Sequence, residues 1–288
     1  MGTDEDRPLD PDHTVELLWN TGADQVTDVR LSLSRIVTTA VDLADADGLA
    51  ELSMRRIAER LGYTTMALYR HVPGKAELID LMRDAVYAEI EASAGASDWR
   101  SGLAAWARDN RDLHRRHRWL VDSTGSRRVP GPNIMSNFER VLAIAASSRL
   151  PPAEVLAVVD LIGGFVDSAA RSEQEVEKTE QRTGQTHQQW WEDRDSLYER
   201  VGDYPTLRRL WESGGYDQPV DAFEFGLERT LDGIELLVRR RDENRDGKKP
   251  VRCEVCGAVM PEPRRGRPRS YCSRSCQQRA YRRRQSSE

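Results

Sequence analysis

Four cysteines lie near the C-terminus of this 288-residue chain, and they form two pairs. Cys253 and Cys256 are separated by two residues, Cys272 and Cys276 by three, and fifteen residues lie between the pairs. Four thiolates at these spacings suit tetrahedral zinc, and Gly257 permits the turn that aims backbone N–H groups at sulfur. We predict a zinc site here, with two disulfides or unreactive thiols as the alternatives.

The segment around these cysteines is strongly basic. Residues 248–288 contain 12 Lys and Arg but 3 Asp and Glu, whereas residues 1–247 carry a net charge of −14. We therefore expect a separate basic module, which bound metal would stabilise because 41 residues bury too small a core. It resembles small zinc-ribbon and treble-clef modules, and Arg264–Arg269 resembles the core of AT-hooks. Auxiliary DNA binding is the expected role, with a solubilising or protein-binding surface as the alternative.

A second group of side chains is suited to reading DNA. Hydroxyl, methyl, imidazole and guanidinium groups that fit base edges and phosphates follow one another along a short segment, at Thr64, Thr65, Ala67, Tyr69, Arg70 and His71. Arg55 and Arg56 before this segment, and Lys75 after it, are placed to bind phosphates on either side. The alternative interpretation is an ordinary helical hairpin with a charged surface.

Two short helices joined by a tight turn must position these groups. Ser53 is the expected cap of a first helix, Gly62 ends it, and Thr64 or Thr65 starts the second. The small Ala58 lets the two helices approach each other, which matches the helix-turn-helix plan over residues 53–71. A helix from Ser32 precedes the motif, and a helix from Lys75 to Ile90 follows it.

The rest of the body has helical periodicity and no strand-length alternation, so we predict an all-α fold. Helices are expected at residues 98–116, 118–124, 134–148, 152–171, 204–214 and 219–241. Residues 172–203 are polar, and part of this stretch is expected to be a mobile loop. Aromatic and polar side chains inside these helices are candidates for lining a ligand pocket, with plain core as the alternative: Trp106, His114, Trp119, Asn133, Phe138 and Phe165.

Two of these helices, at residues 152–171 and 219–241, carry long apolar stripes. A single helix-turn-helix reads only a few base pairs, and two-fold dimers that read a palindrome are the usual solution. We therefore expect a homodimer built on these two helices, although an intramolecular core explains the stripes nearly as well.

One part of the chain resembles a known family. Residues 33–81, with Leu52–Arg55, Leu61-Gly62, Leu68–Val72 and Lys75 as the carrying features, resemble the DNA-binding domain of TetR-family repressors. The body to about residue 242 is loosely similar to the tetracycline-repressor type of C-terminal domain. The resemblance implies a three-helix DNA-binding domain and a ligand-binding, dimerising domain behind it. It places DNA contacts at Arg55, Thr65, Met66, Ala67, Tyr69, His71 and Lys75.

These observations divide the chain into four parts. We expect a mostly disordered arm with one or two helical turns (1–28), a helix-turn-helix domain (29–80), a helical ligand-binding and dimerisation domain (81–244) and the basic zinc module (245–288). No apolar run could span a membrane and no secretory signal is visible, so a cytoplasmic location is expected.

The function expected from the sequence is a DNA-binding repressor that a small molecule releases from a palindromic operator. The alternative is a zinc-tethered adaptor with secondary nucleic-acid binding. Catalysis is not expected, because phosphate loops, nucleophile elbows and His-carboxylate metal motifs are absent from the sequence.

Overall fold

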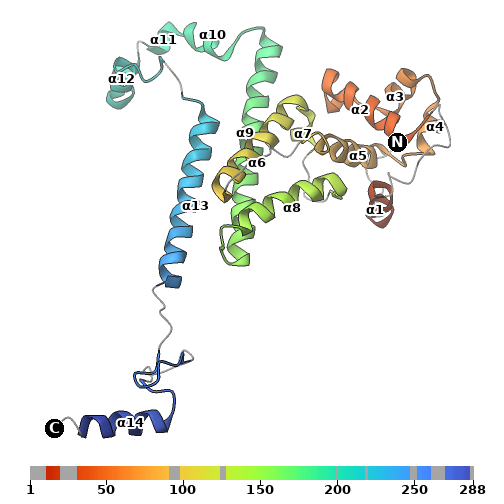
Figure 1. Cartoon of the computed structure of the whole chain (residues 1–288). Helices are drawn as coiled ribbons and strands as arrows, with labels where there is room; N and C mark the ends of the chain where they lie inside the picture. The colour runs from red at the N-terminus through yellow and green to blue at the C-terminus, as the bar shows by residue number, and fades with distance from the viewer. Residues whose placement is uncertain are drawn as a thin grey trace. The chain divides into compact units, whose positions relative to one another are not determined.

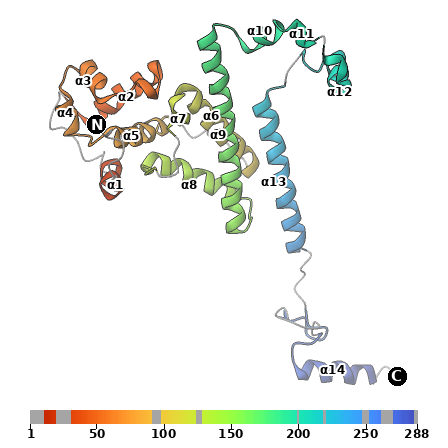
Figure 2. The same ribbon diagram turned by 180° about the vertical axis from the view of Figure 1, so that it is seen from behind.

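The computed structural model describes residues 11–19, 31–90, 98–123, 128–198, 200–217, 220–246, 252–260 and 270–285. The chain divides into two units, residues 1–235 and 236–288. Within the described ranges the regular structure is helical, apart from an isolated antiparallel bridge between Arg252 and Val259 (Figures 1 and 2). The predicted all-α class is confirmed. No helix in the described part is long and apolar enough to cross a membrane.

The first unit contains the predicted helix-turn-helix. Helix α2 (Leu33–Asp47) precedes a short 3-10 turn (Leu49–Glu51), and α3 (Met54–Leu61) and α4 (Thr65–Tyr69) follow. The side chains of Ser53 and Thr64 accept hydrogen bonds from backbone N–H groups in the first turns of α3 and α4. Gly62 ends α3 with φ of 76°, a left-handed conformation that favours glycine. The motif therefore begins and ends where the sequence predicts.

Helix α5 (Lys75–Tyr87) lies behind the motif and shares its core. The same core includes Leu18 of helix α1 (Pro11–Trp19), which is 1% exposed. Part of the segment expected to be a mostly disordered arm is therefore a packed helix, because Thr14 and Leu18 share a face and are both buried. The rest of the predicted arm, residues 1–10 and 20–28, lies outside the described residues.

The remaining helices of the first unit form a larger group. Helices α6 (Trp99–Arg116), α8 (Pro132–Ala146) and α9 (Pro152–Thr183) pack against one another, and the short α7 (Trp119–Asp122) packs on α9 (Figure 1). The chain continues through α10 (His187–Glu192), α11 (Asp195–Tyr198), a 3-10 turn (Val201–Asp203) and α12 (Pro205–Glu212). Helix α13 (Ala222–Asp246) begins in the first unit and ends in the second.

The polar stretch after residue 171 differs from the expectation. Helix α9 continues to Thr183 and ends at Gly184, so residues 172–183 are helical. Gln174 is buried on this extension and donates to the carbonyl oxygen of Arg118, while Lys178 binds Asp122 at 3.0 Å. Hydrogen bonds and ion pairs hold this part of the helix, so an apolar stripe is not needed to position it.

The second unit contains the four cysteines, and we call residues 252–285 the four-cysteine module. A tight loop follows the start of the Arg252–Val259 bridge, and helix α14 (Arg274–Gln285) begins within the second cysteine pair. Cys253, Cys276 and Met260 form a small buried cluster with Val255 and Tyr271 packed against it.

Candidate functional sites

The predicted recognition segment presents its side chains on the surface of α4. Leu68 is fully buried and anchors the helix, whereas Met66 is 68% and Tyr69 39% exposed. Of the other predicted contacts, Thr64 and Arg70 are exposed and Thr65, Ala67 and His71 are half-buried. The arrangement leaves one short helix free to enter a DNA groove, as the helix-turn-helix plan requires.

The three predicted phosphate-binding cations differ from one another. Arg55 is exposed and pairs with Glu59, one turn later on α3, at 2.8 Å. Arg56 instead binds the Asp47 carboxylate at 2.6 Å and the carbonyl oxygen of Glu51, so it ties α3 to the end of α2. Lys75 is half-buried, and its Nζ lies 3.4 Å from the carbonyl oxygen of Leu49. Arg56 thus has a structural role, and the DNA contacts of all three cations remain predictions.

A buried histidine joins the helix-turn-helix to the larger helical group. His117, the residue that ends α6, has Nδ1 2.9 Å from Asp45 Oδ1 on α2 and Nε2 3.0 Å from Glu89 Oε2. Trp119 donates from Nε1 to the same Asp45 oxygen at 2.8 Å. We name His117, Trp119, Asp45 and Glu89 the histidine joint. It connects α2 and the end of α5 to α6 and α7.

A second connection joins α5 to α8. Asp84 of α5 accepts hydrogen bonds from the backbone N–H groups of Asn133 and Ile134 and from the Asn133 side chain, at 2.9–3.0 Å. It therefore caps the N-terminus of α8 from another helix. A Cβ at Gly131 would lie 2.3 Å from the Asp84 carboxyl carbon, so only glycine allows this approach. Burial raises the pKa of the Asp84 carboxyl, although these donors act to lower it.

Polar side chains fill the interface between α6 and α8. Trp106 donates to Asn137 Oδ1 at 3.0 Å, and Asn137 donates to Asn110 Oδ1 at 2.9 Å. His114 lies with Nδ1 2.8 Å from the carbonyl oxygen of Asn110, and both residues are buried. Arg140 binds Asp109 at 3.2 Å beside them. Amide, indole and imidazole groups thus meet inside the helical group, where they hydrogen-bond to one another and to the backbone.

Aromatic rings gather at the contact between α9 and α13. The rings of Phe165 and Phe223 lie 5.3 Å apart between centroids, and the Arg111 guanidinium lies 4.1 Å from the centroid of Phe223. Phe165 packs so closely on Gly226 that a Cβ there would lie 2.7 Å from the ring. These rings pack α9 against α13.

The six predicted pocket residues therefore lie in several places. Trp106 and His114 share the α6–α8 network, and Phe165 joins the α9–α13 rings. Trp119 belongs to the histidine joint, Asn133 binds Asp84, and Phe138 is 40% exposed. Their ligand contacts remain predictions.

The sequence analysis missed Asn110 and Asn137, which complete the polar network. An asparagine at a core-facing position of each of two amphipathic helices was the available signal, since buried polar groups need partners.

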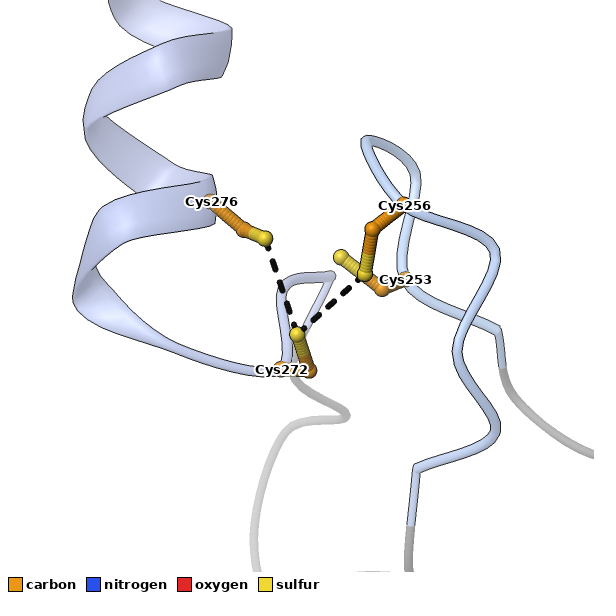
Figure 3. Close-up of side chains that lie close together, drawn as sticks. All are labelled: Cys253, Cys256, Cys272 and Cys276. Carbon is orange, nitrogen blue, oxygen red and sulfur yellow. Dashed lines mark hydrogen bonds between the residues drawn. The ribbon is translucent and has the colours of Figure 1, made fainter.

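The four cysteine sulfurs converge on one point (Figure 3). All four Sγ atoms lie within 4.8 Å of one another, with Cys256 3.5 Å and Cys276 3.6 Å from Cys272. A tetrahedron with metal–sulfur bonds of about 2.3 Å has sulfurs about 3.8 Å apart, whereas a disulfide needs about 2.05 Å. The spacing fits metal ligation and does not fit disulfides.

The backbone around Cys253 favours its thiolate. N–H groups of Cys256 and Cys272 lower the pKa of the Cys253 thiol to about 6. Hydrogen bonds with Cys256 and Cys276 raise the pKa of Cys272 to about 12. Gly257, with φ of 73°, forms the turn that the sequence analysis expected after the first pair.

Comparison with known proteins assigns the chain to a family. The model of "Bacterial regulatory proteins, tetR family" matches residues 36–82, and that of "Tetracyclin repressor-like, C-terminal domain" matches residues 92–238. The chain belongs to the TetR family. It is a transcriptional regulator, as the resemblance over residues 33–81 implied. Both family matches end before the first cysteine, so the four-cysteine module lies outside them.

Relatives of this TetR-family chain include named repressors. The HTH-type transcriptional repressor DrrR1 of Streptomyces coeruleorubidus is 43% identical over 235 residues, which cover 79% of this chain and 87% of that protein. The class A tetracycline repressor from transposon 1721 of Escherichia coli is 27% identical over 76% of this chain and 98% of that repressor.

Solved structures share the fold of the TetR-family body. Apo ActR from Streptomyces coelicolor matches with a TM-score of 0.60 and 28% identity, covering 75% of this chain and all of ActR. ActR has also been solved in complex with actinorhodin, and that structure matches with a TM-score of 0.59 and 29% identity over 72% of this chain and 96% of ActR.

Proposed function

We propose that this TetR-family regulator is a homodimeric repressor that binds a palindromic operator through α4 and dissociates when a small molecule binds the helical domain. The observation that carries the proposal is the double connection between an exposed recognition helix and a polar helical interior. The histidine joint links α6 to α2, and Asp84 links α5 to α8. Repression is also supported by the 43% identity to the repressor DrrR1.

The operator contacts follow from exposure and chemistry. Thr65, Met66 and Ala67 form the base-reading centre, where a methyl or hydroxyl group suits the thymine methyl and its neighbours. Tyr69, Arg70 and His71 at the end of α4, with Arg55, Thr64 and Lys75 around it, contact the phosphate backbone. Such a regulator acts on chromosomal DNA and therefore in the cytoplasm.

The dimer is proposed to form through α9 and α13. Both helices expose large apolar side chains, with Leu156 50%, Leu161 53% and Phe225 55% accessible in the single chain. Gly164 is exposed on α9, with space for another backbone to approach. A two-fold pair of such helices buries this surface and sets the distance between the two α4 helices.

The effector is proposed to be an aromatic molecule that carries several hydrogen-bonding groups. Asn110, Asn137 and His114 offer polar contacts, and Trp106 and Phe165 offer aromatic surface. The structure of ActR in complex with actinorhodin supports a small-molecule effector for this chain. A ligand that moves α6 or α8 acts on α2 and α5 through their connections, and a coupling of about 1–3 kcal/mol is enough to release DNA.

Operator release can be tested with actinorhodin as the probe. Purified protein is bound to the DNA upstream of its own gene, and the complex is titrated with actinorhodin while a thermal shift reports binding to the protein. We expect actinorhodin to stabilise the protein and to dissociate the complex, and Asn110→Ala to weaken both effects. Binding without dissociation would contradict ligand-released repression, and absence of binding would contradict the proposed effector class.

The four-cysteine module is proposed to hold one zinc ion. The convergence of the four sulfurs supports this, because Cys256 and Cys272 are exposed and yet lie only 3.5 Å apart. Cys253, Cys256, Cys272 and Cys276 would be the ligands, and the ion would supply structural stability rather than chemistry at an open coordination position.

A further inference from the structure

We propose that the four-cysteine module is a second DNA-binding element, whose helix α14 contacts the phosphate backbone of the duplex beside the operator. The proposal rests on the zinc site and on the operator binding proposed above. It assigns a partner to a part of the chain that the family matches do not reach, since those end at residue 238.

Charge is the first argument. Residues 252–260 and 270–285 contain six arginines and one glutamate, whereas residues 1–247 carry a net charge of −14. A body with this net charge is repelled overall by the DNA backbone. The four-cysteine module instead carries a net positive charge. A concentrated positive patch is the electrostatic requirement for binding phosphates.

The geometry of α14 is the second argument. Arg279, Arg282 and Arg283 are spaced three and four residues apart, so they share one face of the helix, and all three are exposed. Tyr281, 62% exposed, lies on the opposite side of the helix. Guanidinium groups that share one exposed helix face can bind the phosphate oxygens of a DNA strand together.

The cysteine cluster explains how such a helix is held. Twelve residues form a marginal helix in isolation, and α14 has little apolar surface of its own to bury. Its first turn is held by Cys276, which belongs to the sulfur cluster, and by Ser273, whose hydroxyl accepts from the Cys276 backbone N–H at 3.3 Å. Metal bound by the four sulfurs therefore fixes the helix and the direction of its arginines.

Duplex DNA is favoured over an acidic protein by proximity. The helix-turn-helix of the same chain holds the module near DNA, so the second contact forms at a high effective concentration. Arginines 264, 265, 267 and 269 of the AT-hook-like segment lie outside the described residues, and the proposal does not depend on them.

The test measures how operator affinity depends on salt for the full-length protein. The variant Arg279→Gln/Arg282→Gln/Arg283→Gln removes three charges, and Arg279→Lys/Arg282→Lys/Arg283→Lys is the charge-matched control. Binding to an operator duplex with about two helical turns of flanking DNA on each side is measured from about 0.05 to 0.3 M KCl. Zinc per chain is measured for every protein by elemental analysis.

For DNA binding, log K falls as log[KCl] rises, so the slope is negative. We expect the glutamine variant to make this slope shallower by up to about 2.7 per chain, and to weaken binding at about 0.15 M salt by tenfold or more. The lysine control should keep the wild-type slope, and all three proteins should contain one zinc per chain. A glutamine variant that retains zinc and the wild-type slope would overturn the proposal and favour an acidic protein partner.

Failure of the underlying proposals gives different results. If operator recognition is absent, the wild type binds operator DNA and scrambled DNA with equal affinity. The slopes of log K against log[KCl] on scrambled DNA still differ between the wild type and the glutamine variant, because that difference depends on the module alone. If bound metal does not hold α14 in place, removing zinc from the wild type with a chelator leaves its salt dependence unchanged. That result would contradict the proposal that DNA binding by the four-cysteine module depends on metal.

Discussion

His117 and Asp45 meet at 2.9 Å although they lie on opposite sides of the boundary between the helix-turn-helix and the larger helical group. His117 ends α6, and Asp45 lies in the last turn of α2. The His117 side chain is 8% exposed, so water screens this contact poorly. The pair is a direct contact between the helical group and the DNA-binding helices, and we propose that it transmits changes between them.

Asp45→Asn should lower the melting temperature, because a neutral amide oxygen is a weaker hydrogen-bond acceptor for His117 and Trp119 than the carboxylate. We expect a cost of about 1–2 kcal/mol, measured by thermal or urea unfolding. The matched control is Asp42→Asn, an exposed position one turn earlier on the same helix. Equal melting temperatures for the two variants would mean that the histidine joint adds no stability.

Gly226 and Gly233 form a second matched pair, both on α13. Gly226→Ala should destabilise the protein by about 1–3 kcal/mol, because the new methyl group would overlap the Phe165 ring, which Phe223 prevents from moving freely. Gly233→Ala meets no atom within 4 Å and should be neutral or stabilising by up to about 1 kcal/mol. Chemical denaturation distinguishes the two, and the same sign for both would show that the α9–α13 contact is looser than described.

Glu173 gives a prediction for pH. It binds Arg111 at 2.6 Å and Arg115 at 2.9 Å, and although burial acts to raise its pKa, these hydrogen bonds hold it below the ordinary 4.5. A lowered pKa stabilises the fold above pH 4.5, and this contribution is lost as the pH falls through the folded-state value.

Glu173→Gln should therefore cost roughly 1 kcal/mol at pH 7 and progressively less as the pH falls below 4.5. Melting curves between about pH 7 and pH 4 provide the measurement. Glu175→Gln, exposed on the same helix, should show no such pH-dependent difference from wild type. A constant difference for Glu173→Gln at all pH values would argue against the ion pair as its cause.

Zinc content gives a direct prediction for the four-cysteine module. Wild-type protein should contain one zinc per chain, and Cys256→Ser should lose most of it, since one of four sulfur ligands is removed. Ser270→Ala, an exposed position two residues before Cys272 and outside the sulfur set, should retain the metal. Zinc in the Cys256→Ser variant equal to wild type would show that this sulfur is not a ligand.

Local signals explain which parts of the fold could be predicted. Ser53, Gly62 and Thr64 act on the backbone within three residues, so their caps and turn are visible in the sequence. The extension of α9 to Thr183 was not visible, because Gln174 and Lys178 are positioned by partners more than fifty residues away. Polar helices held by distant contacts lack the apolar period on which prediction depends.

The same distinction between local signals and distant contacts applies to the candidate sites. Tyr69 and Met66 could be located because the whole motif is contiguous, and the four cysteines because their spacing is diagnostic. The roles of Asp45 and Asp84 could not be predicted from the sequence, since each residue binds partners about fifty or more positions later in the chain. Trp119 was assigned to a pocket by its type, and only the fold places it beside Asp45.

The most direct test of the account is a DNase I footprint on the DNA upstream of the gene, with wild type, Tyr69→Ala and Tyr204→Ala. Tyr69 lies on α4, whereas Tyr204 is an equally large side chain, 62% exposed, beside α12. We predict two protected half-sites with two-fold symmetry, about one helical turn or a multiple of it apart, for wild type and Tyr204→Ala. The footprint should be lost or strongly weakened in Tyr69→Ala. An asymmetric footprint, or one that Tyr69→Ala leaves intact, would contradict operator recognition by a dimer through α4.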